Sequence, residues 1–287
     1  LSRRQRQMCI RDRLPSGWLF LKHSQFSTLH SQLNKAVQKT FYIIGISDSH
    51  QMYFPPEVEE VIKRGKVFSG GKRHHEIVAS YLPADAEWID ITVPLEKVFE
   101  QYQAHTEMVV FASGDPLFFG FANTIQRVLP EAVLKLYPSF NSLQMLAHRL
   151  VLPYQDMRIV SLTGRNWNGL DKALIEGEAL IGVLTDREKT PATVAKRMLD
   201  YGYDNYRMAV GELLGNEEQE CVRTYSLQEA EKLTFRFPNN LILKRTVTRP
   251  RLFGIPDGAF CLLNGRARMI TKRPVRLVTL SLTLIHI

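Results

Sequence analysis

Residues 108–120 read MVVFASGDPLFFG, and this stretch decides the fold class. Its first five residues form a continuous apolar run with β-branched and aromatic side chains, which predicts a buried strand. Gly114, Asp115 and Pro116 follow directly. Glycine permits a tight turn, aspartate can cap a helix, and proline suits a first helical position. The stretch therefore predicts a strand, a turn and a helix over 117–129, which is the repeating unit of an α/β protein.

The same alternation of strands and helices continues over the body of the chain, which indicates an α/β protein with mostly parallel sheets. The segment LVLPYQD at 150–156 is a natural seam. We therefore expect two α/β domains, 41–152 and 153–246. Strands are predicted at 41–46, 66–69, 88–91, 108–112, 133–136, 158–162, 179–184, 207–210, 221–224 and 241–244. Helices are predicted at 57–65, 72–82, 95–103, 117–129, 170–176, 191–201 and 227–232, and one more reaches about residue 150.

The two ends of the chain differ from this body in charge. Residues 1–40 carry 8 Lys and Arg against 1 Asp, and residues 250–287 carry 6 against 1. Residues 41–249 carry 23 Lys and Arg against 27 Asp and Glu, so this part of the chain is mildly acidic. Residues 1–40 begin LSRRQRQMCIRDR without Met and show no sustained period, so we expect a disordered or artefactual extension, with a natural basic arm as the alternative. SLTLIHI at 281–287 has the same character.

The bulk composition narrows the class of protein. A mildly acidic body with basic flanks is not the arrangement typical of a nucleic-acid-binding protein. Cys9, Cys221 and Cys261 form no CxxC pair. We therefore expect neither a disulfide framework nor a structural zinc site, and a cytoplasmic location is the default. No apolar run reaches the roughly 20 residues of a membrane span, so no membrane association is expected.

Polar loops follow several predicted strands, which is where ligands bind in parallel sheets. Taken singly, each loop is explained about as well by a turn or a helix cap as by ligand contact. Phe118 and Phe119 could face a cationic sulfonium or an adenine, or pack in the core. Because the loops follow strands in both halves, together they indicate a shared cleft. They are GISDSH at 45–50, ASGDPLFFG at 112–120, YPSFNS at 137–142, VLTDREKTP at 183–191 and GELLG at 211–215.

GGKRHHE at 70–76 is the main basic cluster of the body. Lys72, Arg73 and His74 open a predicted helix after a double glycine, and a helix N-terminus with basic side chains suits an anion. A solvated helix start explains the pattern equally well. His74 and His75 point about 100° apart on a helix, so a metal shared between them is not expected.

These motifs, together with SGGKRHH, LPYQD and VSLTGR, resemble the tetrapyrrole methylase family over roughly residues 41–245. Within it they are most similar to the branch that methylates ring carbon C5 of precorrin-6Y or cobalt-precorrin-7 in cobalamin biosynthesis. The resemblance implies S-adenosylmethionine bound between two α/β domains. Ser47 stands where the family commonly has a second loop glycine. The implied cofactor contacts are Ile46, Ser113, Gly114, Asp115, Leu117, Phe118, Ser142, Leu184 and Glu212.

The tail carries a second resemblance. Residues 252–276 are similar to the opening of the C15-methylating, decarboxylating domain that often follows the C5 enzyme, although Pro274 stands where an acidic residue is expected. We therefore expect 247–287 to be a linker and a truncated start of that domain. The cofactor loop of that domain does not appear, so no C15 or decarboxylase activity is expected.

The substrate implied by the resemblance is a corrinoid macrocycle fringed with carboxylates. Asp48, Lys72, Arg73 and His74 are the expected substrate contacts, since Lys and Arg pair well with carboxylates. An electron-rich ring carbon needs no catalytic nucleophile from the protein, so positioning should supply most of the rate. A homodimer is common in the family and is expected here. The alternatives are another tetrapyrrole or ribosomal-RNA methyltransferase, and a basic nucleic-acid-binding protein without catalysis.

Overall fold

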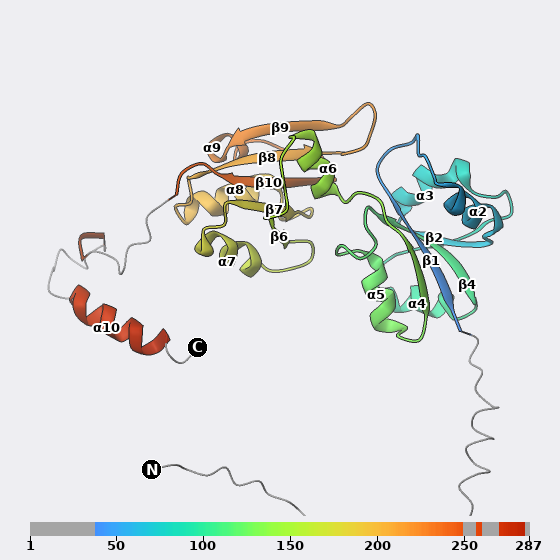
Figure 1. The fold of residues 1–287 in the computed structure, drawn as a ribbon, viewed down its shortest axis with the longest axis horizontal. Coiled ribbons are helices and arrows are strands. Elements are labelled where there is room, and N and C mark those ends of the chain that lie inside the picture. Colours follow the sequence, from blue (N-terminus) through green and yellow to red (C-terminus); the bar gives the residue numbers. More distant parts are fainter. Residues whose placement is uncertain (1–37, 249–256, 260–269, 285–287) are drawn as a thin grey trace, which may run out of the picture.

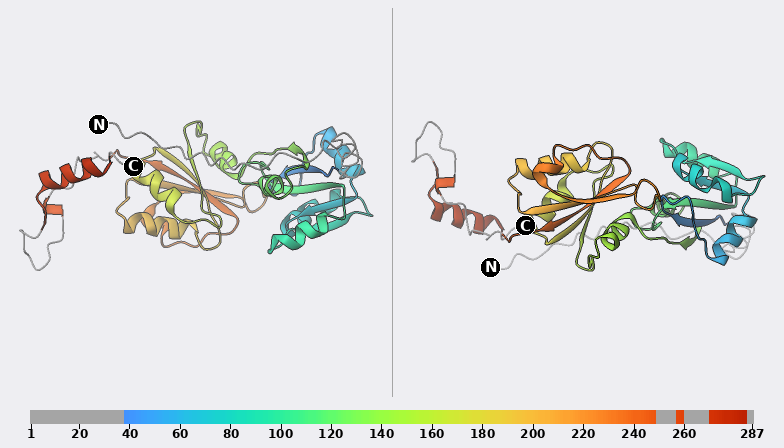
Figure 2. Two further views of the ribbon diagram at one scale, coloured as in Figure 1. Left: turned by 90° about the horizontal axis from the view of Figure 1, so that it is seen from below. Right: turned by 90° about the horizontal axis from the view of Figure 1, so that it is seen from above.

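The computed structural model describes residues 38–248, 257–259 and 270–284. Residues 40–245 of this part form two lobes, each built around a five-stranded sheet flanked by helices (Figure 1). Figure 2 shows from two further sides that the lobes lie end to end. This architecture confirms the predicted α/β class. None of the described helices is long and apolar enough to cross a membrane.

The first lobe contains an all-parallel sheet with strand order β3-β2-β4-β1-β5. All its strands therefore end at the same edge, as the sequence predicted. The strands are β1 (Thr40–Ile46), β2 (Val67–Gly70), β3 (Glu87–Asp90), β4 (Glu107–Ser113) and β5 (Val133–Tyr137). Its helices are α2 (Pro56–Arg64), α3 (Lys72–Val78), α4 (Leu95–Tyr102) and α5 (Phe121–Val128), with a 3₁₀ turn at Ala79–Tyr81.

Helices cover both faces of this sheet, which explains why its central strands are continuous apolar runs. In β1, Phe41 and Ile43 pack in the core beneath α4 and α5. Tyr42 and Ile44 point the other way, into the core beneath α2 and α3. Alternate residues of a strand point to opposite faces. A two-sided core thus holds β1 and β4 rigidly at the centre, and the loops that follow them inherit this position.

The second lobe contains a mixed sheet with strand order β6-β7-β10-β8-β9. Only β6 and β7 pair in parallel, and the other three pairings are antiparallel. The expectation of mostly parallel strands therefore holds for the first sheet alone. The strands are β6 (Arg158–Ser161), β7 (Leu180–Leu184), β8 (Tyr206–Glu212), β9 (Cys221–Ser226) and β10 (Asn239–Arg245). The helices of the lobe are α6 (Ser142–Arg149), α7 (Asn168–Glu176), α8 (Pro191–Asp200) and α9 (Leu227–Ala230).

The length of the connections explains this difference. A parallel pair needs a crossover of a dozen or more residues, whereas an antiparallel pair needs only a short loop. Residues 213–220 join β8 to β9 without a helix, so the two strands form a hairpin. β10 then enters between β7 and β8, antiparallel to both.

Helix α6 packs with the second lobe, although the sequence places it before the predicted seam at 150–156. Leu143 and Leu146 are fully buried, in one cluster with Met157 and Ile242. The chain therefore passes between the sheets at 138–141. An apolar helix face is stabilised by whichever sheet covers it, and local sequence does not specify that sheet. The domain boundary near residue 152 stays a prediction.

The helix expected at 117–129 begins later, at Phe121. Asp115 does not cap it. Instead the Oδ1 atom of Asp115 accepts a hydrogen bond from the Leu117 N–H at 2.9 Å, which closes a local turn. Gly120 is the residue at the helix cap.

Most of the predicted C15-domain segment lies outside the described residues, as do Cys9, Cys261 and the chain before residue 38. The described part of the tail contains a 3₁₀ turn at Asp257–Ala259 and helix α10 (Arg273–Leu284). Cys221 is a free cysteine at the start of β9.

Candidate functional site

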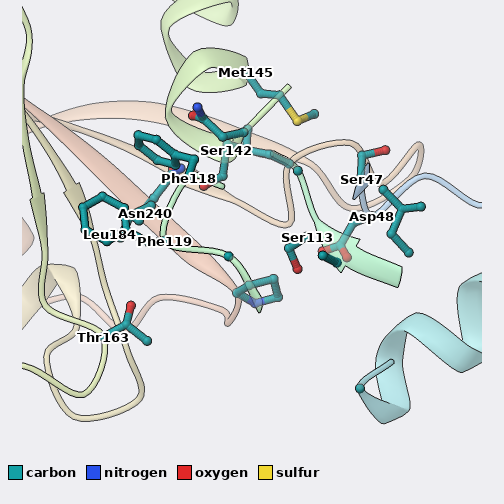
Figure 3. Close-up of a pocket in the computed structure, with 18 of the residues that line it drawn as sticks. Ser47, Asp48, Ser113, Phe118, Phe119, Ser142, Met145, Thr163, Leu184 and Asn240 are labelled. Atoms are coloured by element: carbon teal, nitrogen blue, oxygen red, sulfur yellow. The ribbon is translucent and has the colours of Figure 1, made fainter. Parts of the chain in front are cut away.

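A cleft of about 520 Å³ lies between the two lobes and is lined by residues from both. Figure 3 shows Ser47, Asp48 and Ser113 of the first lobe on one side, with Thr163 of the second lobe across from them. The first wall consists of the ends of β1 and β4, the start of α3 and the turn before α5. The second wall consists of the ends of β6, β7 and β8 together with the start of β10.

Two glycines bring the loops of the first wall together. A Cβ atom on Gly45 would lie 1.8 Å from the Gly114 carbonyl oxygen, so only glycine fits there. Gly114 has φ of 61°, and a Cβ on it would lie 2.8 Å from the Cα of Asn141. The Gly114 N–H donates to the Ile46 carbonyl at 2.8 Å, and its carbonyl accepts from the Ser139 N–H at 3.3 Å. The loops after β1, β4 and β5 are therefore packed backbone against backbone.

A polar network occupies the first wall beside α3. The Arg73 guanidinium forms an ion pair with Asp48: its Nε lies 3.2 Å from Oδ1, and its Nη1 donates to Oδ2 at 3.3 Å. Its Nη2 also donates to the Ser113 Oγ at 3.3 Å. The Nδ1 atom of His74 accepts the Gly71 N–H at 3.3 Å, so the imidazole proton is on Nε2, which lies 2.9 Å from the Ser113 Oγ.

Burial sets the charges in this network. Desolvation and the neighbouring Arg73 cation lower the pKa of His74 to about 4, so the ring is neutral at pH 7. Burial raises the pKa of Asp48, while Arg73 partly opposes that shift. Of the three basic side chains in the KRH segment, Arg73 alone presents a positive charge to the cleft, because Lys72 does not line it. Arg73 is therefore the cation of this wall, and it is paired with Asp48.

Phenylalanine side chains line the cleft. Phe118 and Phe119 pack edge to face with ring centroids 5.2 Å apart. Phe119 has φ of 54°, which is unusual for a bulky residue and typical of functional loops. Phe140 and Phe237 line the cleft yet keep large exposed fractions, 58% and 48%. Exposed aromatic side chains lining one cavity are a feature of sites that bind flat ligands.

The loops of the second wall are held by side-chain hydrogen bonds. The Thr163 hydroxyl donates to the Thr185 carbonyl at 3.1 Å. The Asp186 carboxylate accepts the Gly164 N–H at 3.2 Å and the Lys189 N–H at 2.6 Å. The VSLTGR and VLTDREKTP motifs are therefore joined to each other, and Asp186 has a structural role.

Asn240 is the most unusual polar residue of the cleft. It lies near the start of β10, is 1% exposed, and lines the cavity. Neither its Oδ1 nor its Nδ2 atom has a hydrogen-bond partner among the residues that the structure describes. An unpaired buried amide costs about 1–3 kcal/mol per group. A ligand that carries a donor and an acceptor side by side would satisfy it.

Most of the site residues expected from the sequence do line the cleft, and four do not. The carboxylate of Asp115 is used in its own turn, and Leu117 is about half exposed, away from the cavity. The Glu212 carboxylate accepts the Arg236 N–H, and Lys72 points to solvent. The expected residues that line the cleft are Ile46, Asp48, Arg73, His74, Ser113, Gly114, Phe118, Ser142 and Leu184.

The structure adds lining residues that the motifs did not assign. Three of them come from VSLTGR, so that motif was a usable signal. Residues 237–240 gave no such signal, because they precede a strand rather than follow one. The added residues are Ser47, Gly71, Ile91, Phe111, Ala112, Phe119, Gly120, Phe121, Phe140, Asn141, Met145, Ser161, Thr163, Arg165, Thr185, Gly211, Leu214, Phe237, Pro238, Asn239 and Asn240.

The fold and cleft define a two-lobed α/β protein with a cleft between its two sheets that is partly lined by aromatic side chains. The family model of the tetrapyrrole (corrin/porphyrin) methylases matches residues 40–231. That match covers more than half of the chain, so the chain belongs to the tetrapyrrole methylase family. It is an S-adenosylmethionine-dependent methyltransferase.

Curated relatives share a moderate identity with the chain. Precorrin-6Y C(5,15)-methyltransferase [decarboxylating] from Sinorhizobium sp is 29% identical over 244 residues, which is 83% of this chain and 58% of the relative. Cobalt-precorrin-7 C(5)-methyltransferase from Salmonella typhimurium is 22% identical over 179 residues, which is 62% of this chain and 86% of the relative. The chain thus spans little more than half of the first relative.

Solved structures agree on the fold. The precorrin-6Y methylase from Archaeoglobus fulgidus has a TM-score of 0.52 at 16% identity, covering 74% of this chain and all of that one. The uroporphyrin-III C-methyltransferase from Thermus thermophilus, solved with S-adenosylhomocysteine, has a TM-score of 0.54 at 19% identity, covering 71% and 92%.

Proposed function

We propose that the protein methylates ring carbon C5 of a precorrin in cobalamin biosynthesis. One observation carries this choice. The two relatives described above differ in length and in named activities, and methylation at C5 is the activity that both names contain. The chain aligns with 86% of the relative whose name contains C5 methylation alone.

The residues of the cleft fit S-adenosylmethionine. The unpaired amide of Asn240 offers a donor and an acceptor in a buried position, which matches the edge of an adenine ring. Ser113 and Gly114 lie where β4 ends, and Ser142 is the first residue of α6; all three line the cleft. Leu184 and Phe118 supply apolar contacts. When bound, the cofactor supplies a methyl group on a positively charged sulfur.

The protein's own contribution is to position and desolvate the reactants. Arg73 is held in place by Asp48 and by Ser113, so its charge is fixed before a ligand arrives. Preorganised charges of this kind cost no reorganisation during reaction. The aromatic side chains of Phe118, Phe119 and Phe140 line the cavity between the lobes and offer apolar surface to a bound ligand. Holding two reactants in line can contribute roughly 7–11 kcal/mol to barrier reduction.

Methyl transfer with defined tetrapyrroles tests the proposal. The purified chain is incubated with isotope-labelled S-adenosylmethionine and either precorrin-6Y or cobalt-precorrin-7. We expect the corrinoid to gain one methyl group, located at C5 by NMR. Uroporphyrinogen III and ribosomal RNA serve as competing substrates and should not be labelled. Label at another ring position, or on a competing substrate alone, contradicts the proposal.

Two further expectations concern the whole chain. Removing residues 1–37 should leave methyl transfer unchanged, because this deletion leaves Lys39, strand β1 and every described lining residue of the cleft in place. A protein that acts by binding nucleic acid through its basic flanks would lose function instead. We also propose a homodimer, which light scattering on the purified protein tests directly.

A further inference from the structure

Arg165 belongs to the VSLTGR motif, whose role the proposed function leaves open. Its loop follows β6 and is fixed at three points. The Thr163 hydroxyl donates to the Thr185 carbonyl, and the Gly164 N–H donates to the Asp186 carboxylate. The Arg165 N–H closes the turn on the Leu162 carbonyl at 3.0 Å. The backbone of Arg165 is therefore well placed, and its side chain lines the cleft.

The Arg165 side chain reaches across to the other lobe. Its guanidinium carbon lies 4.9 Å from the centre of the Phe119 ring, which belongs to the turn before α5. A guanidinium that stacks on a ring uses its flat face and leaves the N–H groups along its edge available. Those N–H groups are arranged to match a carboxylate. Phe119 thus orients Arg165 without using its donors.

The charges of the cleft make Arg165 distinctive. The ionised side chains lining the cavity are Arg73, Asp48 and Arg165. Arg73 and Asp48 neutralise each other through a two-point ion pair. Among the described residues no carboxylate forms an ion pair with Arg165. The cleft therefore has one uncompensated positive charge, on the wall opposite Arg73.

We propose that Arg165 binds a carboxylate on the rim of the tetrapyrrole substrate, across the cleft from Arg73. This inference rests on the proposed function, because it requires an acid-fringed macrocycle between the lobes. The cofactor's methionine portion also carries a carboxylate and is the other source of the same chemistry. The two sources are separated by measuring each ligand alone.

Arg165→Gln removes the charge and keeps a side chain of similar length. Binding is measured by calorimetry for S-adenosylhomocysteine, and then, with S-adenosylhomocysteine present, for cobyrinic acid and cobinamide. These two corrinoids share one ring, but the side chains are free carboxylates in the first and amides in the second. Arg187→Gln is the matched control, because Arg187 also stacks on a phenylalanine of the second lobe, 5.3 Å from the Phe237 ring, without lining the cleft.

We expect Arg165→Gln to weaken cobyrinic acid binding about 10-fold or more, which is the usual effect of losing a charge-assisted hydrogen bond. Binding of cobinamide and of S-adenosylhomocysteine should change less than about 2-fold. Arg165→Lys should recover part of the loss, and Arg187→Gln should match the wild type. Added salt should weaken cobyrinic acid binding more in the wild type than in Arg165→Gln.

Three results would overturn the inference. The first is that Arg165→Gln binds cobyrinic acid as tightly as the wild type does, while the wild type still prefers cobyrinic acid to cobinamide. The proposed function then stands without a role for Arg165. The second is a loss confined to S-adenosylhomocysteine, which assigns Arg165 to the cofactor. The third is a wild type that binds both corrinoids equally, which removes the inference together with the acid-fringed substrate. The C5-labelling assay reports separately on the reaction.

Discussion

The two walls of the cleft are constructed in different ways. The first wall contains strand ends from a parallel sheet, packed backbone against backbone through Gly45 and Gly114. The second wall comes from a mixed sheet, where the start of β10 lies between the ends of β7 and β8. Its loops are held by side-chain hydrogen bonds such as those of Thr163 and Asp186. The first wall should therefore be sensitive to added bulk, and the second to lost polar groups.

The largest effect is expected from Gly45→Ala in the first wall. The new methyl group would lie 1.8 Å from the Gly114 carbonyl, and backbone cannot move aside as a flexible side chain can. We expect the free energy of unfolding to fall by more than about 3 kcal/mol, or folding to fail. Thermal and urea unfolding measure the change.

Gly71→Ala is the matched control for that experiment. Gly71 directly follows strand β2 of the first sheet, but a Cβ there would meet only the His74 Nδ1, at 3.8 Å. We expect a change of less than about 1 kcal/mol. Equal losses in the two variants would mean that the packing of the first wall does not depend on the Gly45–Gly114 contact.

The second wall is tested by Asn240→Leu, which removes a buried amide without partners. The ligand-free protein should gain about 1–2 kcal/mol of stability, because an unsatisfied polar group is replaced by an apolar one. Affinity for S-adenosylhomocysteine should fall about 10-fold or more. Calorimetry and thermal unfolding measure the two effects.

Asn205→Leu provides the comparison for Asn240→Leu. Asn205 also has a buried, unpaired Oδ1 atom, but it lies outside the cleft and its Nδ2 donates to the Val247 carbonyl at 2.8 Å. Its replacement should leave S-adenosylhomocysteine binding unchanged. If the two variants bind the ligand alike, the assignment of Asn240 to the cofactor is wrong.

A smaller, pH-dependent effect is expected from His74. Its pKa is lowered from 6.5 to about 4 in the folded protein. Below pH 6.5 the unfolded chain binds a proton that the folded protein does not, so stability is present above that pH and is lost as the pH falls toward 4. Between pH 7 and 5 the wild type should lose about 1–2 kcal/mol more than His74→Gln. Urea unfolding at a series of pH values measures this difference. If the free energy of unfolding depends on pH in the same way in both proteins, this account is wrong.

Strand periodicity proved a strong guide to the elements. The ten predicted strands all appear, with ends shifted by at most a few residues. Short apolar runs bounded by glycine and polar loops are governed by local sequence, and the loops after β1 and β4 meet because their strands are parallel neighbours. Nine of the expected site residues therefore line one cleft.

Asn239 and Asn240 were missed for one physical reason. The rule that ligands bind at the carboxyl ends of strands does not cover an antiparallel strand, whose amino end lies at that edge. Asn239 and Asn240 precede the apolar run of β10, so local sequence gave no reason to place them in the site. Arg165 belongs to the VSLTGR motif, but its contact with Phe119 could not be predicted, because the two residues lie far apart in the sequence.

The sequence by itself determined the strands, the family motifs and the loops that carry the first wall, since apolar period and glycine placement act over a few residues. Only the tertiary structure decided the direction of β10 and the lobe against which α6 packs. It also decided which of Arg73, Arg165 and Asn240 has an ion-pair or hydrogen-bond partner. These properties depend on contacts between residues distant in the chain, and their energies become defined only once both sheets are in place.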